Sequence, residues 1–382
     1  MDNFEHRRHR ILVCADCGEE FVFTVSAQEY FETLGKYDIP RYCKTCQWRR
    51  DLGERWRPAG DKRLRHNPKP QMELIDAHSH FLSYNYFRLL TQQRTQYDDI
   101  DSFIIDRSRR HNFNVPPEDP VRLADQWVIE MDRYGVSRMA IMASLPGDGS
   151  SVAAALRVYP DRFLGVTMVD PYLAVSEELI EHKAREWGFR GMALYPTLHR
   201  FSARSDRLYP IYRLARRYRM VVYVHFGYLR IPPRRWWDLP DLYDSHYSDP
   251  SDLHQVAADF PTVKFVVPCF GAGTLRALLR LGVQCPNLYV DTSSSNSWIM
   301  DQSEFSSLRE VFERTLEVFG PARMIFGTDS GTFPRGWRHD IYQQQLDILH
   351  SIGLSPRALE AIMGQNARQL FGLDRDLPTY VV

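Results

Sequence analysis

Leu74-Ile75-Asp76-Ala77-His78-Ser79-His80 is the stretch from which we interpret the whole chain, an apolar run that ends in an acid and two histidines. Residues i and i+2 of an extended strand point to the same side. His78 and His80 can therefore present two imidazoles to one point, as a divalent metal ion requires. Because His-x-His is a short pattern, it also fits two surface histidines at a strand end, so the rest of the chain must decide.

The length and composition of the chain indicate a globular protein with a substantial core. Its 382 residues, 44% of them hydrophobic, suit one large domain with a small one, or two medium domains. Lys and Arg together equal Asp and Glu at 48 each, so the overall charge indicates neither a nucleic acid nor a membrane partner. No run of about 18 apolar residues predicts a spanning helix, and residues 1–10 lack an apolar signal core. We therefore expect a cytoplasmic protein.

Four of the six cysteines form two Cys-x2-Cys pairs, Cys14 with Cys17 and Cys43 with Cys46. In a reducing compartment such pairs favour metal thiolates, with disulfides or free thiols as alternatives. Four thiolates complete a tetrahedral zinc site and leave no position open for a substrate. We therefore predict a structural zinc ion, whose binding supplies folding free energy to a segment with few apolar residues.

The segment around these cysteines resembles zinc-ribbon modules. The matching residues are Cys14-Ala-Asp-Cys17-Gly18-Glu-Glu-Phe21 and Tyr42-Cys43-Lys-Thr-Cys46. We predict a zinc-ribbon domain over residues 1–56, with a hairpin strand at Phe21–Val25 and a short helix within Gln28–Leu34. A basic linker is expected at 57–71, where Pro and Gly interrupt a polar chain. The positive charge of residues 41–65 suits a solvated linker, a contact with an acidic surface of the second domain or contacts with phosphates.

From Met72 onward, short apolar runs alternate with amphipathic helical patterns. Eight candidate strands lie at 73–76, 137–143, 163–169, 190–195, 221–226, 264–268, 288–292 and 324–328. Eight strand–helix units in about 300 residues predict an α/β fold, a parallel (β/α)8 TIM barrel over residues 72–382. A doubly wound open sheet is the alternative.

Spacing and capping signals predict several of the helices. They are expected near 86–94, at 120–134, from Thr274 to Gly282, and from Ser303 to just before Gly320. Residues 81–135 exceed what one helix needs. We therefore expect an insertion after the first strand that covers the barrel mouth.

Candidate metal ligands stand at the ends of three predicted strands. His78 and His80 end the first, His225 ends the fifth and Asp329 ends the eighth. Alone, His225 fits a core histidine and Asp329 fits a loop acid. In a (β/α)8 barrel, however, the carboxyl ends of the strands meet at one face, where active sites lie. Three imidazoles and one carboxylate that converge there make a mononuclear site for zinc or another divalent ion.

Residues 72–382 resemble the amidohydrolase superfamily, in particular the amidohydrolase-related branch that includes decarboxylases of the aminocarboxymuconate-semialdehyde type. The matching segments are Ile75-Asp-Ala-His78-Ser-His80, His225-x-Gly227, Phe326-Gly-Thr-Asp329 and Gly364-Gln-Asn-Ala-Arg-Gln-Leu-Phe-Gly-Leu373. The resemblance implies that His78, His80, His225 and Asp329 hold the metal, and that Asp329 also handles a proton of an activated water. It implies hydrolysis of an amide or lactone, or non-oxidative decarboxylation of an organic acid.

Two departures from the family pattern concern the fourth and sixth strands. Binuclear members carry a bridging Lys or Glu on the fourth strand, whereas this one ends in Tyr195, which favours a single metal. Cys269 stands at the end of the sixth strand, where the family has a histidine that acts as acid and base or binds a second metal. Three readings of Cys269 stay open: a thiolate ligand, a nucleophile or proton carrier, or a small core thiol in a barrel that has lost the family chemistry.

Further candidates are substrate contacts near the barrel mouth. Arg338, with Arg335 beside it, can grip a carboxylate, although a solvated loop explains both equally well. Tyr195 is a second candidate for a substrate contact. Trp236-Trp237 can stack on a flat substrate or form a subunit contact, and residues 291–296 offer polar groups or helix caps.

The sequence thus predicts a metal-dependent hydrolase or decarboxylase that acts on a small organic acid, amide or lactone. One divalent ion, zinc by preference, is expected in the barrel, and the resemblance also suggests a homodimer. The alternative is a catalytically altered barrel that serves as a binding or regulatory protein, with the zinc ribbon recruiting a protein partner. Cys269 is the residue that raises this alternative.

Overall fold

The computed structural model describes most of the chain after residue 71 and parts of the chain before it. The described residues are 10–16, 18, 20–23, 38–42, 72–94, 96, 99–173, 176–229, 231–240, 242–293, 305 and 307–374. The chain divides into two compact units, Met1–Lys69 and Pro70–Val382. The finer domain limits expected from the sequence, and the linker at 57–71, stay predictions because the linker lies outside the described residues.

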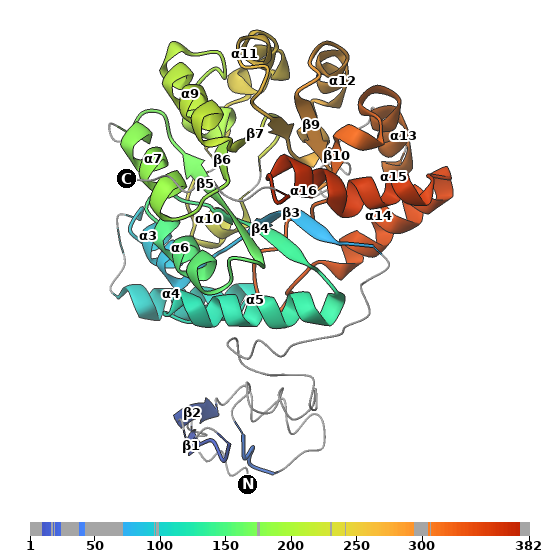
Figure 1. The fold of residues 1–382 in the computed structure, drawn as a ribbon. Helices are drawn as coiled ribbons and strands as arrows, with labels where there is room; N and C mark the ends of the chain where they lie inside the picture. Colours follow the sequence, from blue (N-terminus) through green and yellow to red (C-terminus); the bar gives the residue numbers. More distant parts are fainter. Residues whose placement is uncertain are drawn as a thin grey trace. The chain divides into compact units, whose positions relative to one another are not determined.

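Within its described residues, the first unit has an antiparallel pair of strands (Figure 1). β1 (Arg10–Val13) pairs with β2 (Glu20–Phe23), which overlaps the predicted strand; β1 itself was not predicted. Cys14 follows β1, is buried, and its carbonyl accepts from Gly18 N–H at 2.9 Å. Cys17, Cys43, Cys46 and the helix expected within Gln28–Leu34 lie outside the described residues, so the zinc site stays a prediction.

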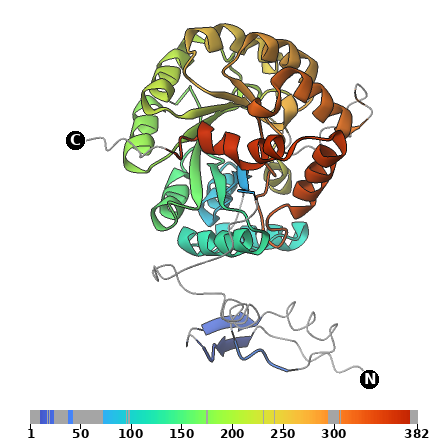
Figure 2. The same ribbon diagram turned by 45° about the vertical axis from the view of Figure 1, so that its right-hand side comes forward.

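The second unit is a parallel (β/α)8 barrel, as the sequence predicted. Its strands are β3 (Ile75–His80), β4 (Arg138–Ala143), β5 (Phe163–Val169), β6 (Gly191–Leu194), β7 (Val221–Val224), β8 (Phe265–Val267), β9 (Leu288–Asp291) and β10 (Met324–Ile325). Each pairs in parallel with the next, and a parallel bridge from Ser79 to Ser330 joins the two ends. This closure excludes the open sheet. Figures 1 and 2 show most of the helices as a ring outside the strands, with α16 across one end of the barrel.

The helices follow the strands around this ring. They are α3 (Tyr84–Thr91), α4 (Ile100–His111), α5 (Pro120–Tyr134), α6 (Gly149–Val158), α7 (Ser176–Glu186), α8 (Pro196–His199), α9 (Tyr209–Tyr218), α10 (Pro232–Trp236), α11 (Leu253–Asp259), α12 (Leu275–Gln284), α13 (Leu308–Phe319), α14 (His339–Ile352), α15 (Pro356–Glu360) and α16 (Asn366–Leu370). None of the described helices is long and apolar enough to cross a bilayer.

The insertion after β3 was predicted correctly in part. Helix 120–134 is confirmed as α5, and the helix expected near 86–94 is α3, which begins earlier because Ser83 Oγ accepts from Tyr86 N–H at 2.9 Å. α4 lies between them and was missed. Its apolar positions are few, and it ends on six polar residues, so its periodicity is weak.

Two predicted helix ends were wrong. α13 does not start at Ser303, which lies outside the described residues; it begins at Leu308, because Ser307 Oγ accepts from Glu310 N–H at 3.2 Å and caps it. α12 does not close at Gly282 but continues to Gln284. Gly282 lies there because a Cβ would stand 2.4 Å from the Phe319 ring, so this glycine permits helix packing rather than marking a helix end.

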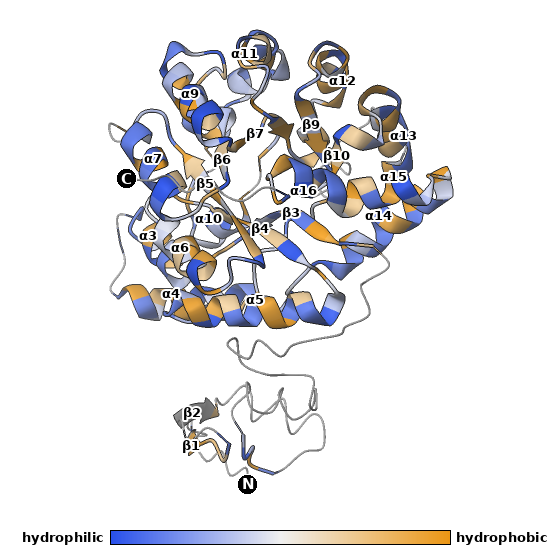
Figure 3. Ribbon diagram, viewed as in Figure 1, coloured by the Kyte–Doolittle hydropathy of each residue, from blue (hydrophilic) through white to orange (hydrophobic). Residues whose placement is uncertain are grey.

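The strands are buried on both faces, which explains their continuous apolar runs (Figure 3). One face packs against the helices and the other forms an inner cluster that contains Ile75, Ala77, Ala140 and Met142. α16 contributes Ala367 and Leu370 to this inner cluster, and Phe371 follows directly after the helix.

α16 also marks one end of the barrel. Its Arg368 Nε donates to Glu73 Oε2 at 2.6 Å, and Glu73 lies two residues before the start of β3. α16 therefore plugs the barrel at the amino ends of its strands, and the carboxyl ends are left for the site.

Candidate metal centre

A β-bulge in β3 turns the two histidines toward the barrel interior. Between the paired positions, β3 advances three residues, from Asp76 to Ser79, while β4 advances two, from Met139 to Ile141. Before the bulge, Ala77 faces the interior, so simple alternation would point His78 and His80 outward. The extra residue reverses this parity, and His80 comes to pair with Met142 of the inner cluster.

The segment that follows β10 runs beside β3 and brings Asp329 next to these histidines. Asp329 N–H donates to His78 O at 2.9 Å, and His80 N–H donates to Ser330 O at 2.7 Å. Asp329 adopts a left-handed backbone with φ of 61°. Gly327 permits the close approach, because a Cβ there would lie 2.8 Å from His78 Cβ.

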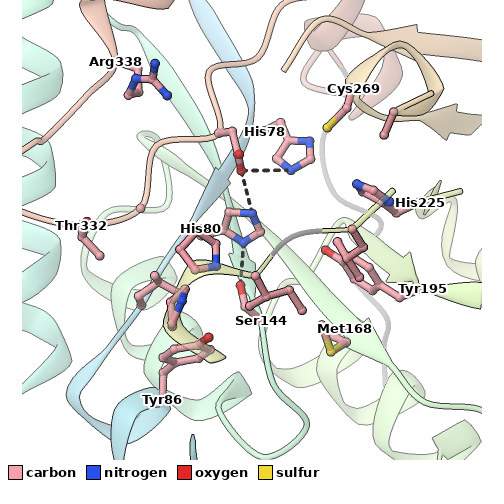
Figure 4. Close-up of a pocket in the computed structure, with 18 of the residues that line it drawn as sticks. His78, His80, Tyr86, Ser144, Met168, Tyr195, His225, Cys269, Thr332 and Arg338 are labelled. Carbon is pink, nitrogen blue, oxygen red and sulfur yellow. Dashed lines mark hydrogen bonds and ion pairs between the residues drawn. The ribbon is translucent and has the colours of Figure 1, made fainter. Parts of the chain in front are cut away.

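Three potential ligand atoms, one each from His78, His80 and Asp329, lie within 4.8 Å of one another. Asp329 Oδ1 is 2.9 Å from His80 Nε2 and 3.9 Å from His78 Nε2. Figure 4 shows the two histidines next to each other in the pocket. They come from the β3 and β10 ends, as predicted from the sequence. Their role as metal ligands stays a prediction.

The other ring nitrogen of each histidine is already engaged. His78 Nδ1 lies 2.7 Å from Asp291 Oδ2, and His80 Nδ1 lies 2.7 Å from Ser144 Oγ. With the protons on Nδ1, both Nε2 lone pairs and the Asp329 carboxylate face one another as electron-pair donors. Such a set needs a positive charge between them, from a proton or a cation, so these residues fit a divalent metal ion.

His225 lines the same pocket from the end of β7 but lies outside the group of three. Its Nδ1 is buried and has no hydrogen-bond partner among the described residues. Its ring stacks on Tyr195 with centroids 5.7 Å apart and faces His78 in Figure 4. Burial, followed by the charge of His78, lowers the pKa of His225 to about 4. It is therefore a neutral imidazole with an unused nitrogen, as a metal ligand or substrate contact requires.

The pocket that joins these residues has a cavity of about 240 Å³. Its polar floor consists of His78, His80, His225 and Asp329, with Cys269 at the edge. Its wall is mostly apolar or aromatic and includes Leu82, Tyr86, Met168, Tyr195, Leu229, Ile231 and Trp236. This volume and lining suit a small, largely apolar molecule with one polar end at the floor.

Comparison with protein families identifies the barrel. The family model described as Amidohydrolase matches residues 75–373. The chain belongs to this family. Family membership makes it an enzyme of the amidohydrolase superfamily. A second model, described as a probable treble clef domain, matches residues 9–53, where the sequence resembles a zinc ribbon. No curated protein matches the chain.

Solved structures match the barrel along most of their length. 5-Carboxyvanillate decarboxylase LigW from Sphingomonas paucimobilis is 14% identical, with 79% of this chain and 99% of that chain covered and a TM-score of 0.53. LigW2 from Novosphingobium aromaticivorans, with manganese and 3-methoxy-4-hydroxy-5-nitrobenzoic acid bound, is 15% identical, with 79% of this chain and 97% of that chain covered and a TM-score of 0.53. A probable 2-pyrone-4,6-dicarboxylic acid hydrolase from Acinetobacter baumannii, with citric acid bound, is 16% identical, with 79% of this chain and 100% of that chain covered and a TM-score of 0.50. At such identities the likeness shows the fold.

In this amidohydrolase, the carboxylate of Asp76 is buried behind the histidines and holds the β3–β10 seam together. It accepts from Thr328 Oγ1 at 2.5 Å, Trp337 Nε1 at 2.8 Å and His78 N–H at 3.1 Å. Burial raises the pKa of Asp76 to about 6 despite these bonds. Burial alone would lower the pKa of His78, but the negative charge and hydrogen bond of Asp291, together with the weaker attraction of Asp329 and Asp76, raise this pKa to about 9.

Cys269 lies in the pocket at the predicted place, but not among the three converging ligand atoms. Its Sγ is 3.3 Å from Ser293 Oγ, and its side chain is buried. Burial, followed by the charges of Asp291 and Asp329, raises the pKa of the Cys269 thiol well above its ordinary value. The protein surroundings therefore favour the neutral thiol.

The structure separates the two candidate arginines of the mouth. Both line the pocket, but Arg338 Nη2 forms an ion pair with Asp340 at 2.7 Å. Arg335 forms no hydrogen bond or ion pair with another residue that the structure describes. Of the two, Arg335 is therefore better placed to receive a substrate carboxylate. Tyr195 lines the pocket, as its strand-end position suggested.

The tandem tryptophans differ in exposure. Trp236 lines the pocket and stacks on Phe113 with centroids 5.1 Å apart. Trp237 is fully buried, and its Nε1 donates to Thr91 Oγ1 at 2.8 Å. Of the two rings, Trp236 alone is therefore placed to contact a substrate, because Trp237 packs against Phe87 and Phe103 of the insertion after β3.

Sequence reasoning gave no specific role to Asp291 and did not single out Ser144. Asp291 ends β9 and Ser144 follows β4, so both stand at the same barrel face as the histidines. That position was the available signal, yet polar residues at strand ends are too common to indicate a contact with one particular histidine.

Proposed function

We propose that this amidohydrolase is a metal-dependent hydrolase or non-oxidative decarboxylase of a small organic acid, amide or lactone. The observation that carries the proposal is the convergence of His78, His80 and Asp329 on one point beneath an apolar pocket. The unpartnered Nδ1 of His225 in the same pocket supports a fourth ligand position.

The residues of the site have distinct tasks in this proposal. A divalent ion held there would act as a Lewis acid toward a substrate oxygen and activate a water. His78 and His80 are oriented by their second ring nitrogens, and His225 remains neutral. Asp329, with about a third of its side chain exposed, can exchange a proton with the substrate or solvent. The apolar wall excludes water from the reacting group.

Zinc is the ion we propose first, on the basis of three imidazoles and one carboxylate. Manganese is the alternative, because it is bound in the similarly folded LigW2. The fold neighbours include both decarboxylases and a probable hydrolase, so they support neither reaction over the other.

The test combines metal analysis with a substrate screen. Purified full chain and the His78→Ala variant are assayed for bound metal and for turnover of aromatic acids, dicarboxylic acids, amides and lactones, with CO2 release separating decarboxylation from hydrolysis. We expect His78→Ala to lose one equivalent of metal and all measurable turnover. The exposed His254→Ala is the matched control and should change neither. Turnover by metal-free His78→Ala protein would refute the proposal.

A binding or regulatory protein is the second candidate, and Cys269 is the observation that favours it. If the barrel has lost the family chemistry, Cys269→His should create turnover that the natural chain lacks. If the natural chain already turns over a substrate, this candidate is excluded.

We also propose a structural zinc ion at Cys14, Cys17, Cys43 and Cys46. The treble clef match supports a metal-stabilised module. Replacing Cys14 and Cys43 by Ser should remove one equivalent of zinc while the barrel metal remains.

A further inference from the structure

We infer that Asp291 is the positioning carboxylate of the barrel metal site, and that Cys269 serves this site through its backbone N–H rather than through its thiol. The inference rests on the metal site of the proposed function and deepens it. It assigns roles to two residues that neither the family match nor the ligand set explains.

Asp291 directs His78. Its Oδ2 accepts from His78 Nδ1 at 2.7 Å, and its side chain is completely buried. This bond keeps the proton on Nδ1 and fixes the ring plane, so that Nε2 faces Asp329. Because water does not reach the carboxylate, the bond is not weakened by competition with solvent.

Asp291 is itself held by the loop that contains Cys269. Its Oδ1 accepts from Cys269 N–H at 3.0 Å and from Ser293 N–H at 2.9 Å, and it also accepts the hydroxyl of Ser293. One oxygen of the carboxylate is thus occupied by the protein frame, and the other is left for His78. The ends of β3, β8 and β9 meet at this one side chain.

The loop after β8 has an unfavourable backbone conformation, which must be stabilised by contacts with the rest of the barrel. Residues 269–273 all have positive φ, with values of 55°, 51°, 81°, 42° and 101°. For the residues that are not glycine this conformation is strained, because the Cβ atom crowds the backbone. Gly227 accepts the loop, since a Cβ there would lie 2.3 Å from the carbonyl oxygens of Gly271 and Ala272.

The position of the Cys269 thiol agrees with a secondary role. It lies 3.3 Å from Ser293 Oγ, which gives its own hydrogen to Asp291, so the thiol is the donor at the outer end of the chain of bonds. Its removal leaves Ser293, Asp291 and His78 bonded to one another. Removal of the Asp291 carboxylate leaves Ser293 Oγ and Cys269 N–H without their acceptor, and leaves His78 Nδ1 with the Ser293 hydroxyl at 3.0 Å in place of a carboxylate.

The test measures the affinity of the barrel for Co²⁺ in the full-length protein, with the proposed ribbon site loaded with zinc, by competition with a chelator. We expect Asp291→Ala to raise Kd by about 10–100-fold. The Kd of Asp291→Asn should lie between those of the natural chain and Asp291→Ala, because an amide oxygen can still accept from His78. Cys269→Ala and Cys269→Ser should stay within about threefold of the natural chain, with unchanged visible cobalt absorption.

The outcomes separate this inference from the proposed function. If His78→Ala abolishes cobalt binding while both Asp291 variants bind like the natural chain, the positioning role is wrong and the metal site stands. If Cys269→Ala weakens binding as much as Asp291→Ala, or removes a sulfur-to-cobalt charge-transfer band, the thiol is a ligand and the inference is overturned. If His78→Ala does not affect binding, the metal site fails and the inference fails with it. Asp291→Asn keeps the test decisive should Asp291→Ala not fold.

Discussion

Two buried polar clusters lie on opposite faces of the barrel wall. The pocket cluster consists of His78, Cys269, Asp291 and Ser293, and the outer cluster consists of Ser83, Asp148, Thr167 and Lys183. Thr167 belongs to the outer face because its neighbours Val166 and Met168 both face the interior. Both clusters contain a buried carboxylate, and both contain a group that can carry positive charge.

The clusters differ in how well their groups are matched. In the pocket cluster both oxygens of Asp291 are hydrogen-bonded, and one meets His78 at 2.7 Å. In the outer cluster Asp148 Oδ2 has no partner among the described residues, and Lys183 Nζ donates to Thr167 rather than to the acid. The pKa values shift toward the neutral forms, raised by burial for Asp148 and lowered by burial to about 8 for Lys183.

The difference teaches that burial alone does not make a polar cluster functional. The hydrogen bonds of Asp291 fix the orientation of the His78 ring, and the loop after β8 that supplies one of them has a strained backbone. Within the part of the chain that the structure describes, Asp148 and Lys183 form no ion pair that would orient another side chain. They reduce the stability of the fold, because no such ion pair offsets their desolvation. The pocket cluster is therefore expected to control metal binding and activity, and the outer cluster only the free energy of unfolding.

The largest expected effect breaks the chemistry of the pocket. Asp329→Asn removes the proton-accepting carboxylate while it keeps the size of the side chain, so kcat should fall by about 10²–10⁴-fold. The control is Asp161→Asn, whose side chain is 92% exposed, with no change in kcat. Steady-state kinetics on whichever substrate the screen identifies would measure both, and equal kcat values in the two variants would contradict the role of Asp329.

The next effect, in the outer cluster, depends on pH. Lys183 has a folded pKa of about 8 against 10.5 when unfolded, so the unfolded chain binds more protons between these values. Stability from this group is therefore lost below pH 8 and recovered as pH rises to 10.5, by about 3 kcal/mol.

Urea unfolding of the natural chain and of Lys183→Met, repeated across this pH range, measures the contribution of Lys183 to the free energy of unfolding. Because the variant has no titrating group at that position, the difference in unfolding free energy should shift toward the natural chain as pH rises through this window. A difference that is constant across the window would show that Lys183 is not desolvated as the structure indicates.

A smaller effect tests the close approach at the seam. In Gly327→Ala the new Cβ would lie 2.8 Å from His78 Cβ and 3.2 Å from Ser293 Cβ, which should cost about 1–3 kcal/mol of stability and weaken metal binding. Gly331→Ala is the matched control, since its nearest contact is 3.5 Å. Thermal unfolding of both variants measures the loss of stability. Equal melting temperatures would mean that β3 and the segment after β10 can move apart enough to accept the new Cβ.

The smallest effect concerns the apolar wall. Trp236→Ala should raise KM about tenfold and leave kcat nearly unchanged, because the ring contacts the ground state and lies away from the polar floor. Trp236→Phe should restore most of the binding. A fall in kcat with constant KM would place Trp236 in the chemistry instead of the wall.

The sequence allowed the barrel and most of its site to be predicted, because the relevant signals are local. Each strand is a short apolar run, and His78, His225 and Asp329 each follow such a run directly. α4 was missed because its apolar periodicity is weak, and α13 was started too early because Ser303 is the same type of capping residue as Ser307, which caps the helix. Asp291 received no role because its partner lies 213 positions away in the chain.

By itself the sequence determined that this protein is a parallel barrel and which side chains reach its open end, since periodicity and strand ends are properties of neighbouring residues. Only the tertiary structure decided where those side chains point. The bulge in β3 reverses the facing of His78 and His80, and it exists because β3 must pair with β4 on one side and with the β10 segment on the other. The same closure brings Asp291 to His78. Such contacts depend on register between distant strands, which no local pattern encodes.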